Sequence, residues 1–440
     1  MPTIVIVVSL LFFYAFVKQD QREFPSFSAR LWLPLLWLVL TSTTLLDVLF
    51  LHRSGYDVSE RIETYVEGNP ISRYTLLALT LLGLMVLLKR KTNRSTIIRS
   101  NWWLFALYFY TLLSAGWSEY QDISIKRWIK IFGTLIMAFV IVFEDNYLEA
   151  FEHVIRRYVF ICLTLSVVFV KFFTHLGFSV GRQGSRVWAG VAPGKNALGM
   201  MCTVSLLFLA WRLIKTRPMS YFDVLPLLMG AYLLIRAGSA TAVVLTVIGL
   251  VLLCGISIMK IPLKKMALLT AALTLGALGV LSFFTSSAIT EGSDLFFRAI
   301  ERDPSLTGRV PMWRDLLRIG SKHPIAGTGY ESFWLENMAD IWKKYAFGPI
   351  NAHNGYVDVY LNLGIIGVAI FMILIVKLLS RLFTESALST YYGQIAFVLC
   401  IIIIIRNITE SSLMNASLSW FLLLFFLIDA RVYAPNPEQA

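Results

Sequence analysis

The sequence predicts an all-α, polytopic membrane protein: a bundle of about 12–13 transmembrane helices with one large extracytoplasmic loop that contains short helices. Two observations support this prediction. Hydrophobic residues make up 57% of the 440 residues and charged residues only 15%, which is too little charge for a water-soluble fold of this length. Apolar runs also recur at close to the ~20 residues with which an α-helix crosses a bilayer.

The apolar runs give the expected helices in chain order. The first, from Pro2 to Val17, is expected to be a membrane helix, because no convincing signal-peptide cleavage site follows it. The expected spans are residues 2–17, 31–51, 73–88, 102–117, 128–143, 158–174, 197–214, 222–236, 239–259, 266–285, 364–380, 394–406 and 417–430. The four cysteines, Cys162, Cys202, Cys254 and Cys400, lie within such runs and are expected to be packing residues.

Basic residues predict which side of the membrane each loop faces, since cytoplasmic loops collect Lys and Arg. With these spans and the N-terminus outside, the basic loops fall on the cytoplasmic side. Their residues are Lys89, Arg90, Lys91, Arg94, Arg99, Arg156, Arg157, Arg212, Lys215, Arg217, Lys260, Lys264, Lys265, Lys377 and Arg381. The net charge of +12 is therefore attributed to topology. No basic, aromatic-rich soluble domain is present, so no nucleic-acid partner is expected.

Three segments are expected on the outer face, namely residues 175–196, the turn at 236–238 and the long segment 289–352. They carry five cations against the sorting rule, which are Arg182, Arg186, Lys195, Arg236 and Arg309. An anionic ligand bound at the outer membrane surface is the simplest explanation. The alternative is that these side chains extend to lipid phosphates.

Two short helices are expected near the long outer segment. One covers residues 310–319 and ends at Gly320; the other covers residues 355–363, with Asn354 or Asn351 as its cap. Arg309 stands at the entrance of the first, where free N–H groups and the helix dipole favour a phosphate. Alternatively, Arg309 ties the loop to a carboxylate such as Asp315 or Glu331.

His353 lies immediately before the second helix and before the span that begins at residue 364. An imidazole titrates near neutral pH, which suits a general base that takes a proton from a hydroxyl group. A hydrogen-bonded structural role is the alternative. No two histidines have metal-ligand spacing, so neither a metal site nor a cofactor is predicted. Arg406 and Glu410 are expected to pair at the outer end of a helix.

The order and spacing of several motifs resemble one known family. The motifs are Thr307-Gly308-Arg309 with Trp313, residues 323–329 (HPIAGTG), residues 352–356 (AHNGY) leading into 364–367 (GIIG), residues 194–199 (GKNALG) and residues 236–239 (RAGS). Over residues 181–370 the chain resembles the O-antigen ligase and exopolysaccharide polymerase superfamily. These are bacterial inner-membrane glycosyltransferases that use a glycan linked to polyprenyl (undecaprenyl) diphosphate and act at the periplasmic face.

The resemblance implies roles for particular residues. By position, His353 matches the family's essential histidine, and Arg309 and Arg236 match its diphosphate-binding arginines; these three are the expected catalytic residues. Expected to contribute to substrate binding are Arg182, Arg186, Lys195, Asn354, Trp313 and Tyr356. The chain departs from the family at Ala192-Pro193-Gly194, where relatives often carry a histidine before the lysine, so the role of Lys195 is open.

The resemblance implies a lipid-linked oligosaccharide donor, an acceptor glycan or glycolipid, and surrounding membrane lipids, and it leaves open a partner that regulates chain length. A polymerase that joins repeat units is favoured over a ligase that attaches glycan to a lipid A core. A polysaccharide transporter or flippase is the alternative of another class. The chain is divided into N-terminal helices at 1–174, a ligase-like core at 175–380 with the outer loop 289–352, and C-terminal helices with a short tail at 381–440.

Overall fold

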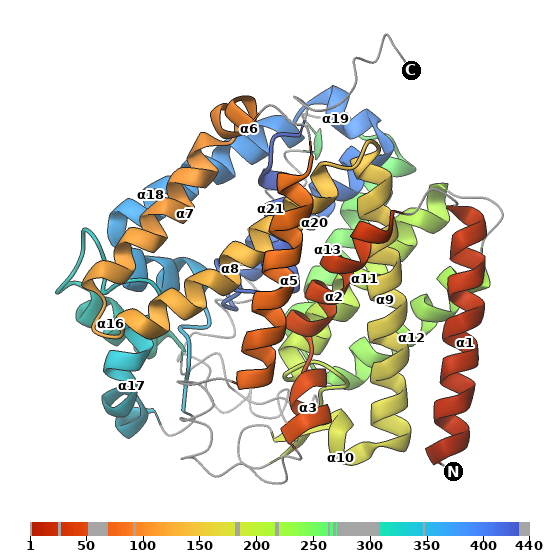
Figure 1. The fold of residues 1–440 in the computed structure, drawn as a ribbon, viewed down its shortest axis with the longest axis horizontal. Helices are drawn as coiled ribbons and strands as arrows, with labels where there is room; N and C mark the ends of the chain where they lie inside the picture. The colour runs from red at the N-terminus through yellow and green to blue at the C-terminus, as the bar shows by residue number, and fades with distance from the viewer. Residues whose placement is uncertain are drawn as a thin grey trace, which may run out of the picture.

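The computed structural model describes residues 2–24, 28–51, 69–90, 94–180, 185–215, 220–262, 265–266, 270, 309–345 and 348–430. Within these residues the protein is almost entirely helical, which confirms the all-α fold class (Figure 1). The described strands form one antiparallel hairpin of β1 (Phe178–Val180) and β2 (Arg186–Trp188), in a segment expected to be a loop. The predicted span 266–285 lies outside the described residues except for Met266 and Thr270.

The first half of the chain follows the predicted apolar runs, with most helices extending a few residues beyond them. Its helices are α1 (Pro2–Glu23), η1 (Ala29–Leu31), α2 (Trp32–Ser42), α3 (Leu45–Leu51), α5 (Pro70–Leu88), α6 (Arg94–Ser100), α7 (Trp102–Ser114), η2 (Ala115–Trp117), α8 (Gln121–Val142), α9 (Tyr147–Phe172) and α10 (Thr174–Gly177). The predicted span 31–51 is broken between α2 and α3. The N–H group of Thr44 at this break donates to the carbonyl of Val191 over 2.8 Å.

The second half contains α11 (Lys195–Lys215), α12 (Tyr221–Ala237), α13 (Ala240–Ser257), α16 (Arg309–Gly320), α17 (Phe333–Lys344), α18 (Gly355–Leu382), α19 (Glu385–Ser389), α20 (Tyr391–Arg406) and α21 (Leu418–Leu427). Five of the described helices are long and apolar enough to cross a membrane: α5, α9, α11 up to Ile214, α13 and α18. The protein is therefore a multi-pass membrane protein. Cys162, Cys202 and Cys400 are buried and unpaired, as expected of packing residues.

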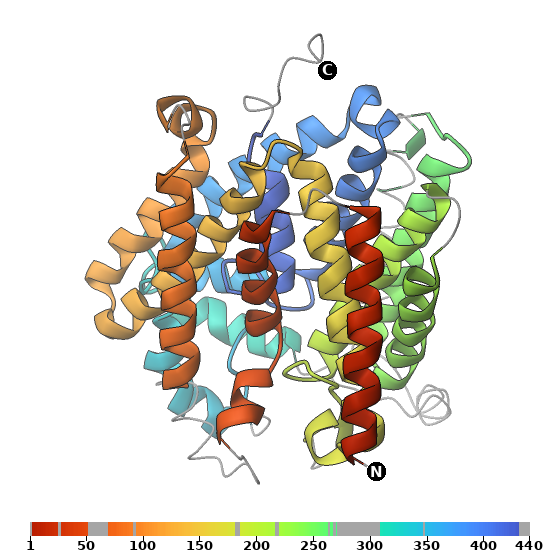
Figure 2. The ribbon, with the colours of Figure 1, turned by 45° about the vertical axis from the view of Figure 1, so that its right-hand side comes forward.

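Figures 1 and 2 agree on the two ends of the bundle. Helices α6 and α19 lie at one end, and α3 and α10 lie at the other, where α1 also begins. Helices α11 and α12 run between the two ends in opposite directions. At the α10 end, α11 packs closely against α13, since a Cβ on Gly199 would lie 2.7 Å from the Cβ of Ala242. This contact brings the start of α11 beside the α12–α13 turn.

The basic residues Arg156, Arg157 and Arg212 do not lie in loops, contrary to the topology prediction. They are buried inside α9 and α11, where they meet acidic side chains of α1, α9 and α12. Arg156 contacts Asp223 at 2.9 Å and Glu23 at 2.7 Å. We call the buried set Asp20, Glu23, Glu152, His153, Arg156, Arg157, Arg212 and Asp223 the Arg156 cluster. Mutual neutralisation makes the burial of these charges tolerable.

Helices α16 and α17 lie in the segment 289–352, which was expected on the outer face. Helix α16 matches the predicted helix 310–319 to within one residue at each end. Helix α17 was not predicted. Together they enclose a small second core of Met312, Leu316, Phe333, Trp334, Ile341, Ala352 and Leu361. This core supports the segment that leads to His353.

Helix α18 is two helices joined at a break, as the separate predictions for 355–363 and 364–380 required. Gly364 has non-helical backbone angles of φ 63° and ψ −165°, and a Cβ there would lie 2.2 Å from the carbonyl oxygen of Ile325. The loop 324–329 satisfies the broken backbone. The N–H of Gly329 donates to Asn362 over 2.9 Å, and the N–H of Ile365 donates to Pro324 over 2.9 Å. Backbone groups at membrane depth need such partners, so the 323–329 motif has a structural function.

Candidate functional site

Four segments that are distant in sequence meet around the carboxylate of Glu410, in the loop after α20. One of its oxygens accepts from Asn196 at the start of α11 over 2.8 Å and lies 3.3 Å from a guanidinium nitrogen of Arg309. The other oxygen lies 3.7 Å from Nδ1 of His353. Ser239, in the α12–α13 turn, donates to the Asn196 side chain over 3.3 Å. We call Asn196, Arg309, His353, Arg406 and Glu410 the Glu410 cluster.

The charge of the Glu410 cluster is dominated by its cations. Burial alone would raise the pKa of Glu410, but the adjacent His353 side chain and the charges of Arg309, His353 and Arg406 lower it to about 2. Glu410 is therefore ionised at every physiological pH. It supplies one negative charge against the two arginines, so the cluster carries excess positive charge whatever the protonation state of His353.

Arg406 was expected to pair with Glu410, and this prediction was wrong. Its side chain is 8% exposed, and its Nη1 has no hydrogen-bond partner among the described residues. Glu410 instead forms its ion pairs with Arg309 and His353. The alternative partners considered for Arg309 are also engaged elsewhere, since Glu331 pairs with Arg127 and Asp315 pairs with Lys344. The carbonyl of Thr409 accepts a further bond from Arg309.

His353 is held by a short, heavily bonded loop. Its backbone is left-handed, with φ 49°, and its N–H donates to the side chain of Asn351 over 3.0 Å. Asn354 caps α18 by accepting from the N–H groups of Tyr356 and Val357. Its side chain is therefore engaged in capping, where the sequence had suggested substrate binding.

Asp358 connects the two loops that carry His353 and Glu410. Its carboxylate accepts from the N–H of Ala352 over 3.1 Å and also from the hydroxyl of Ser411. Trp334 donates to it over 2.8 Å. The carboxylate thus links the residue before His353 to the residue after Glu410. We assign Asp358 as a positioning residue that holds the imidazole and the carboxylate at a set separation.

Two aromatic residues predicted to bind substrate support the same framework. The indole of Trp313 donates to the carbonyl of Ala352 over 2.7 Å. The hydroxyl of Tyr356 donates to the carbonyl of Ile404 over 2.8 Å. Both bonds fix the backbone around His353 and Arg406. Their polar atoms are used within the protein, although each side chain stays partly exposed.

The other predicted binding residues that the structure describes do not contact Glu410. Arg236 is exposed at the end of α12, with its guanidinium 4.9 Å from the ring centre of Trp188. Arg186 donates to the carbonyl of Thr174 and lies over the ring of Phe178. Lys195 is partly exposed, and its neighbour Asn196 makes the contact with Glu410 instead. Arg182 lies outside the described residues.

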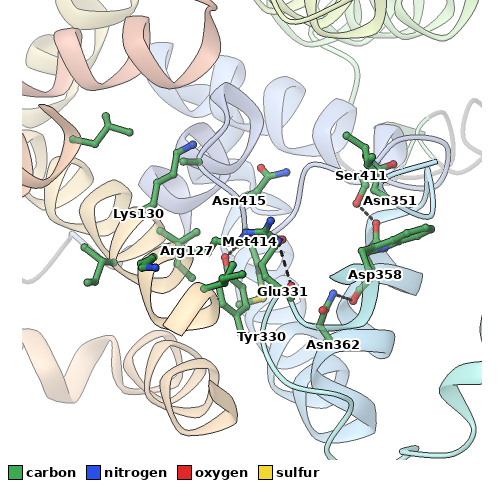
Figure 3. Close-up of a pocket in the computed structure, with 18 of the residues that line it drawn as sticks. Arg127, Lys130, Tyr330, Glu331, Asn351, Asp358, Asn362, Ser411, Met414 and Asn415 are labelled. Atoms are coloured by element: carbon green, nitrogen blue, oxygen red, sulfur yellow. Dashed lines mark hydrogen bonds and ion pairs between the residues drawn. The ribbon is translucent and has the colours of Figure 1, made fainter. Parts of the chain in front are cut away.

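A cavity of about 820 Å³ lies beside the Glu410 cluster (Figure 3). Asn351 and Ser411 line it, and these residues lie two positions before His353 and one after Glu410. Its opposite wall carries Arg127 and Lys130 of α8. The cavity volume falls within the range of about 300–1,000 Å³ that is usual for ligand sites.

A helical membrane protein with a cationic, histidine-containing cluster beside a large cavity is suited to an anionic ligand. Comparison with known proteins specifies the family. Residues 225–372 match the family model described as O-antigen ligase. This segment contains Arg236, Arg309, His353 and Asp358. The match supports the resemblance to the O-antigen ligase and exopolysaccharide polymerase superfamily that the motifs indicate.

One curated relative extends the match beyond that segment. The chain is 21% identical over 300 residues to the exopolysaccharide production protein ExoQ of Rhizobium meliloti. The aligned part covers 64% of this chain and 66% of the relative, so it spans just under two thirds of the relative's length.

Sequence reasoning missed Glu410, Asn196 and Asp358 as site residues and assigned Arg406 only an ion pair. Asn196 lies in the 194–199 motif, but the adjacent lysine drew the prediction because of its charge. Nothing in the predicted helix 355–363 distinguished Asp358 as a site residue. Glu410 could have been identified as a site residue from its position, because it is an acid in a loop expected on the outer face, beside predicted cationic residues.

Proposed function

We propose that the protein transfers an oligosaccharide from a polyprenyl diphosphate carrier to a hydroxyl group of an acceptor glycan. The reaction would take place at the periplasmic face of the bacterial inner membrane, without a metal ion. The observation that carries this proposal is the excess positive charge of the Glu410 cluster. Buried arginines require a negative partner, and a lipid diphosphate leaving group supplies one.

Each residue of the Glu410 cluster has a chemical role in this scheme. As the bond from the sugar to the diphosphate breaks, negative charge gathers on phosphate oxygens, and Arg309 and Arg406 stabilise that charge. Glu410 faces Nδ1 of His353, which leaves Nε2 directed to substrate. Nε2 takes the proton of the attacking hydroxyl, while the carbon–oxygen bond to the acceptor forms and the diphosphate departs. Arg236, three residues before Ser239, is proposed as a further diphosphate ligand.

Polymerisation of repeat units is favoured over ligation to a lipid A core, because the name of the relative ExoQ refers to exopolysaccharide production. A deletion strain separates the two. Loss of a polymerase leaves single repeat units, whereas loss of a ligase leaves bare core and polymer on its carrier.

The direct test uses the purified protein in detergent with a synthetic polyprenyl-diphosphate oligosaccharide and an acceptor. Wild-type protein should extend the acceptor, and His353→Ala should lower kcat by about 10²- to 10⁴-fold, the usual contribution of a general base. Because detergent removes the compartments, transport cannot account for product. Near-normal transfer by a folded His353→Ala protein would overturn the assignment of the base.

A further inference from the structure

The cavity has two chemically different walls. One is cationic and consists of Arg73 from α5 with Lys126, Arg127 and Lys130 from α8. The other carries Asn351, Asp358, Asn362 and Ser411. Figure 3 shows Arg127 and Lys130 on one side and Asp358, Asn351 and Ser411 on the other, with Asn415, Tyr330 and Glu331 between them. Among the described lining residues, four cations face two acids.

Most of these charges are already engaged within the protein. Arg127 pairs with Glu331 at 3.0 Å, and Lys126 pairs with Asp122 at 2.8 Å. The carboxylate of Asp358 accepts three bonds, from Trp334, Ala352 and Ser411. Lys130 differs, because its ammonium group makes no hydrogen bond or ion pair with the described residues and its side chain is exposed to the cavity.

Lys130 lies midway along α8, where the charged first half of the helix gives way to the apolar run Ile131 to Val142. The sequence around it, Ile129 to Phe132, is otherwise apolar. Lys130 is also distant from the Glu410 cluster in sequence, and its ammonium group makes no hydrogen bond or ion pair with the described residues of that cluster. A single compact ammonium group suits a single negative charge, whereas a diphosphate is better matched by several guanidinium groups.

The remaining lining residues suit a sugar. The side-chain amides of Asn69 and Asn362 already bond within the protein, whereas those of Asn351 and Asn415 can offer donors or acceptors to hydroxyl groups. The Oδ1 of Asn415 is buried and has no hydrogen-bond partner among the described residues. The partly exposed indole ring of Trp342 provides a flat apolar face on which a sugar ring can stack. The ammonium group of Lys130 beside such groups favours a sugar that carries a carboxylate.

We propose that this cavity binds an acidic saccharide, whose carboxylate contacts the ammonium group of Lys130. The inference rests on the proposed function, since it places that saccharide next to His353 as the substrate glycan. It adds a specificity: the glycan that enters the cavity carries a negative charge of its own, separate from the diphosphate of the carrier. Lys130 is thus a specificity-determining residue.

Binding of trigalacturonate to the full-length protein in a neutral detergent tests this proposal by calorimetry. The matched ligand is its methyl ester, which has the same sugars without the charges. Wild-type protein should bind the acid roughly tenfold or more tightly than the ester. Lys130→Gln should abolish that difference, and Lys130→Arg should retain most of it. Lys343→Gln, which removes an exposed cation of α17, is the control and should bind as wild type does.

Three outcomes would overturn the inference: equal binding of acid and ester by wild type, an unchanged preference in folded Lys130→Gln, or displacement of trigalacturonate by pyrophosphate through Lys130. The last result would assign the cavity to the carrier. The binding measurement needs no catalysis. Acid-selective binding without glycan transfer would therefore refute the proposed function alone, and transfer without acid selectivity would refute this inference alone.

Discussion

The Arg156 cluster and the Glu410 cluster are both buried sets of charges, but only in the first does every arginine form an ion pair. Three arginines of the Arg156 cluster face four carboxylates, those of Asp20, Glu23, Glu152 and Asp223. In the Glu410 cluster, Arg309 forms an ion pair with Glu410, and the charge of Glu410 acts on Arg406 without an ion pair between them. Paired charges serve structure, whereas a buried cation without an ion pair prepares a site for an anionic ligand.

The two clusters lie at opposite ends of the same helices. On α11, Asn196 belongs to one and Arg212 to the other, and the 16 residues between them correspond to about 24 Å of helix. On α20, Tyr391 and Tyr392 at the start approach Glu152, and Arg406 ends the helix. Helix α19 precedes α20, so the Arg156 cluster lies at the α19 end of the bundle (Figure 1). At one end of the bundle the buried arginines form ion pairs, and at the other end a buried arginine forms none.

The largest effect is expected from removing a cation of the Arg156 cluster. Arg156→Met leaves the acids around it uncompensated in a buried setting, which should destabilise the protein by about 3–5 kcal/mol. Unfolding of the purified protein in detergent measures this loss. Transfer per folded molecule should be unchanged. A variant as stable as wild type would show that the cluster is not structural; Lys343→Gln, on an exposed pair, is the control.

The opposite result is expected for a cation of the Glu410 cluster. Arg406→Met removes a buried charge that forms no ion pair and whose Nη1 has no hydrogen-bond partner among the described residues, so stability should be unchanged or raised. Transfer should fall by about 10²- to 10³-fold in kcat, because one electrostatic contact to the leaving diphosphate is lost. Unfolding and kinetic assays on one preparation measure both quantities. Reduced stability together with normal turnover would reverse the roles assigned to the two clusters.

A smaller effect concerns acid pH. The pKa of Glu410 is lowered from 4.5 to about 2, so the ionised carboxylate stabilises the fold above pH 4.5, and this contribution is lost as the pH falls toward 2. Between pH 7 and pH 3 wild type should lose on the order of 2 kcal/mol that Glu410→Gln does not lose. Thermal unfolding of both proteins at the two pH values measures the difference. Parallel losses would contradict the ion pairs assigned to Glu410.

Local signals in the sequence predicted helices well where caps and apolar periodicity agree. Asn354 begins α18 as a cap, and Gly320 ends α16, both as expected. Predictions of location failed for charged residues whose ion-pair partner lies far away in sequence. Arg156 was assigned to a loop because charge is disfavoured inside a membrane helix, and no local feature marks Asp223, 67 residues away, as the acid that neutralises it.

The same limit applies to the candidate site. The motifs singled out Arg309 and His353, and the structure places both beside Glu410. Glu410 lies 101 residues from Arg309 in sequence, so only the folded bundle shows that the two residues pair. The role of Arg236 in binding diphosphate remains a prediction, since its guanidinium lies over the ring of Trp188.

The apolar pattern alone determined that this chain is a helical membrane protein, because burying backbone in a bilayer permits few other structures. Motif order alone indicated the superfamily that the chain resembles. Tertiary structure decided which charges cancel and which do not, because an ion pair depends on distances between helices that no local sequence specifies. The difference between paired and unpaired buried charges distinguishes the Arg156 cluster from the end of the bundle that is proposed to bind a diphosphate and an acidic sugar.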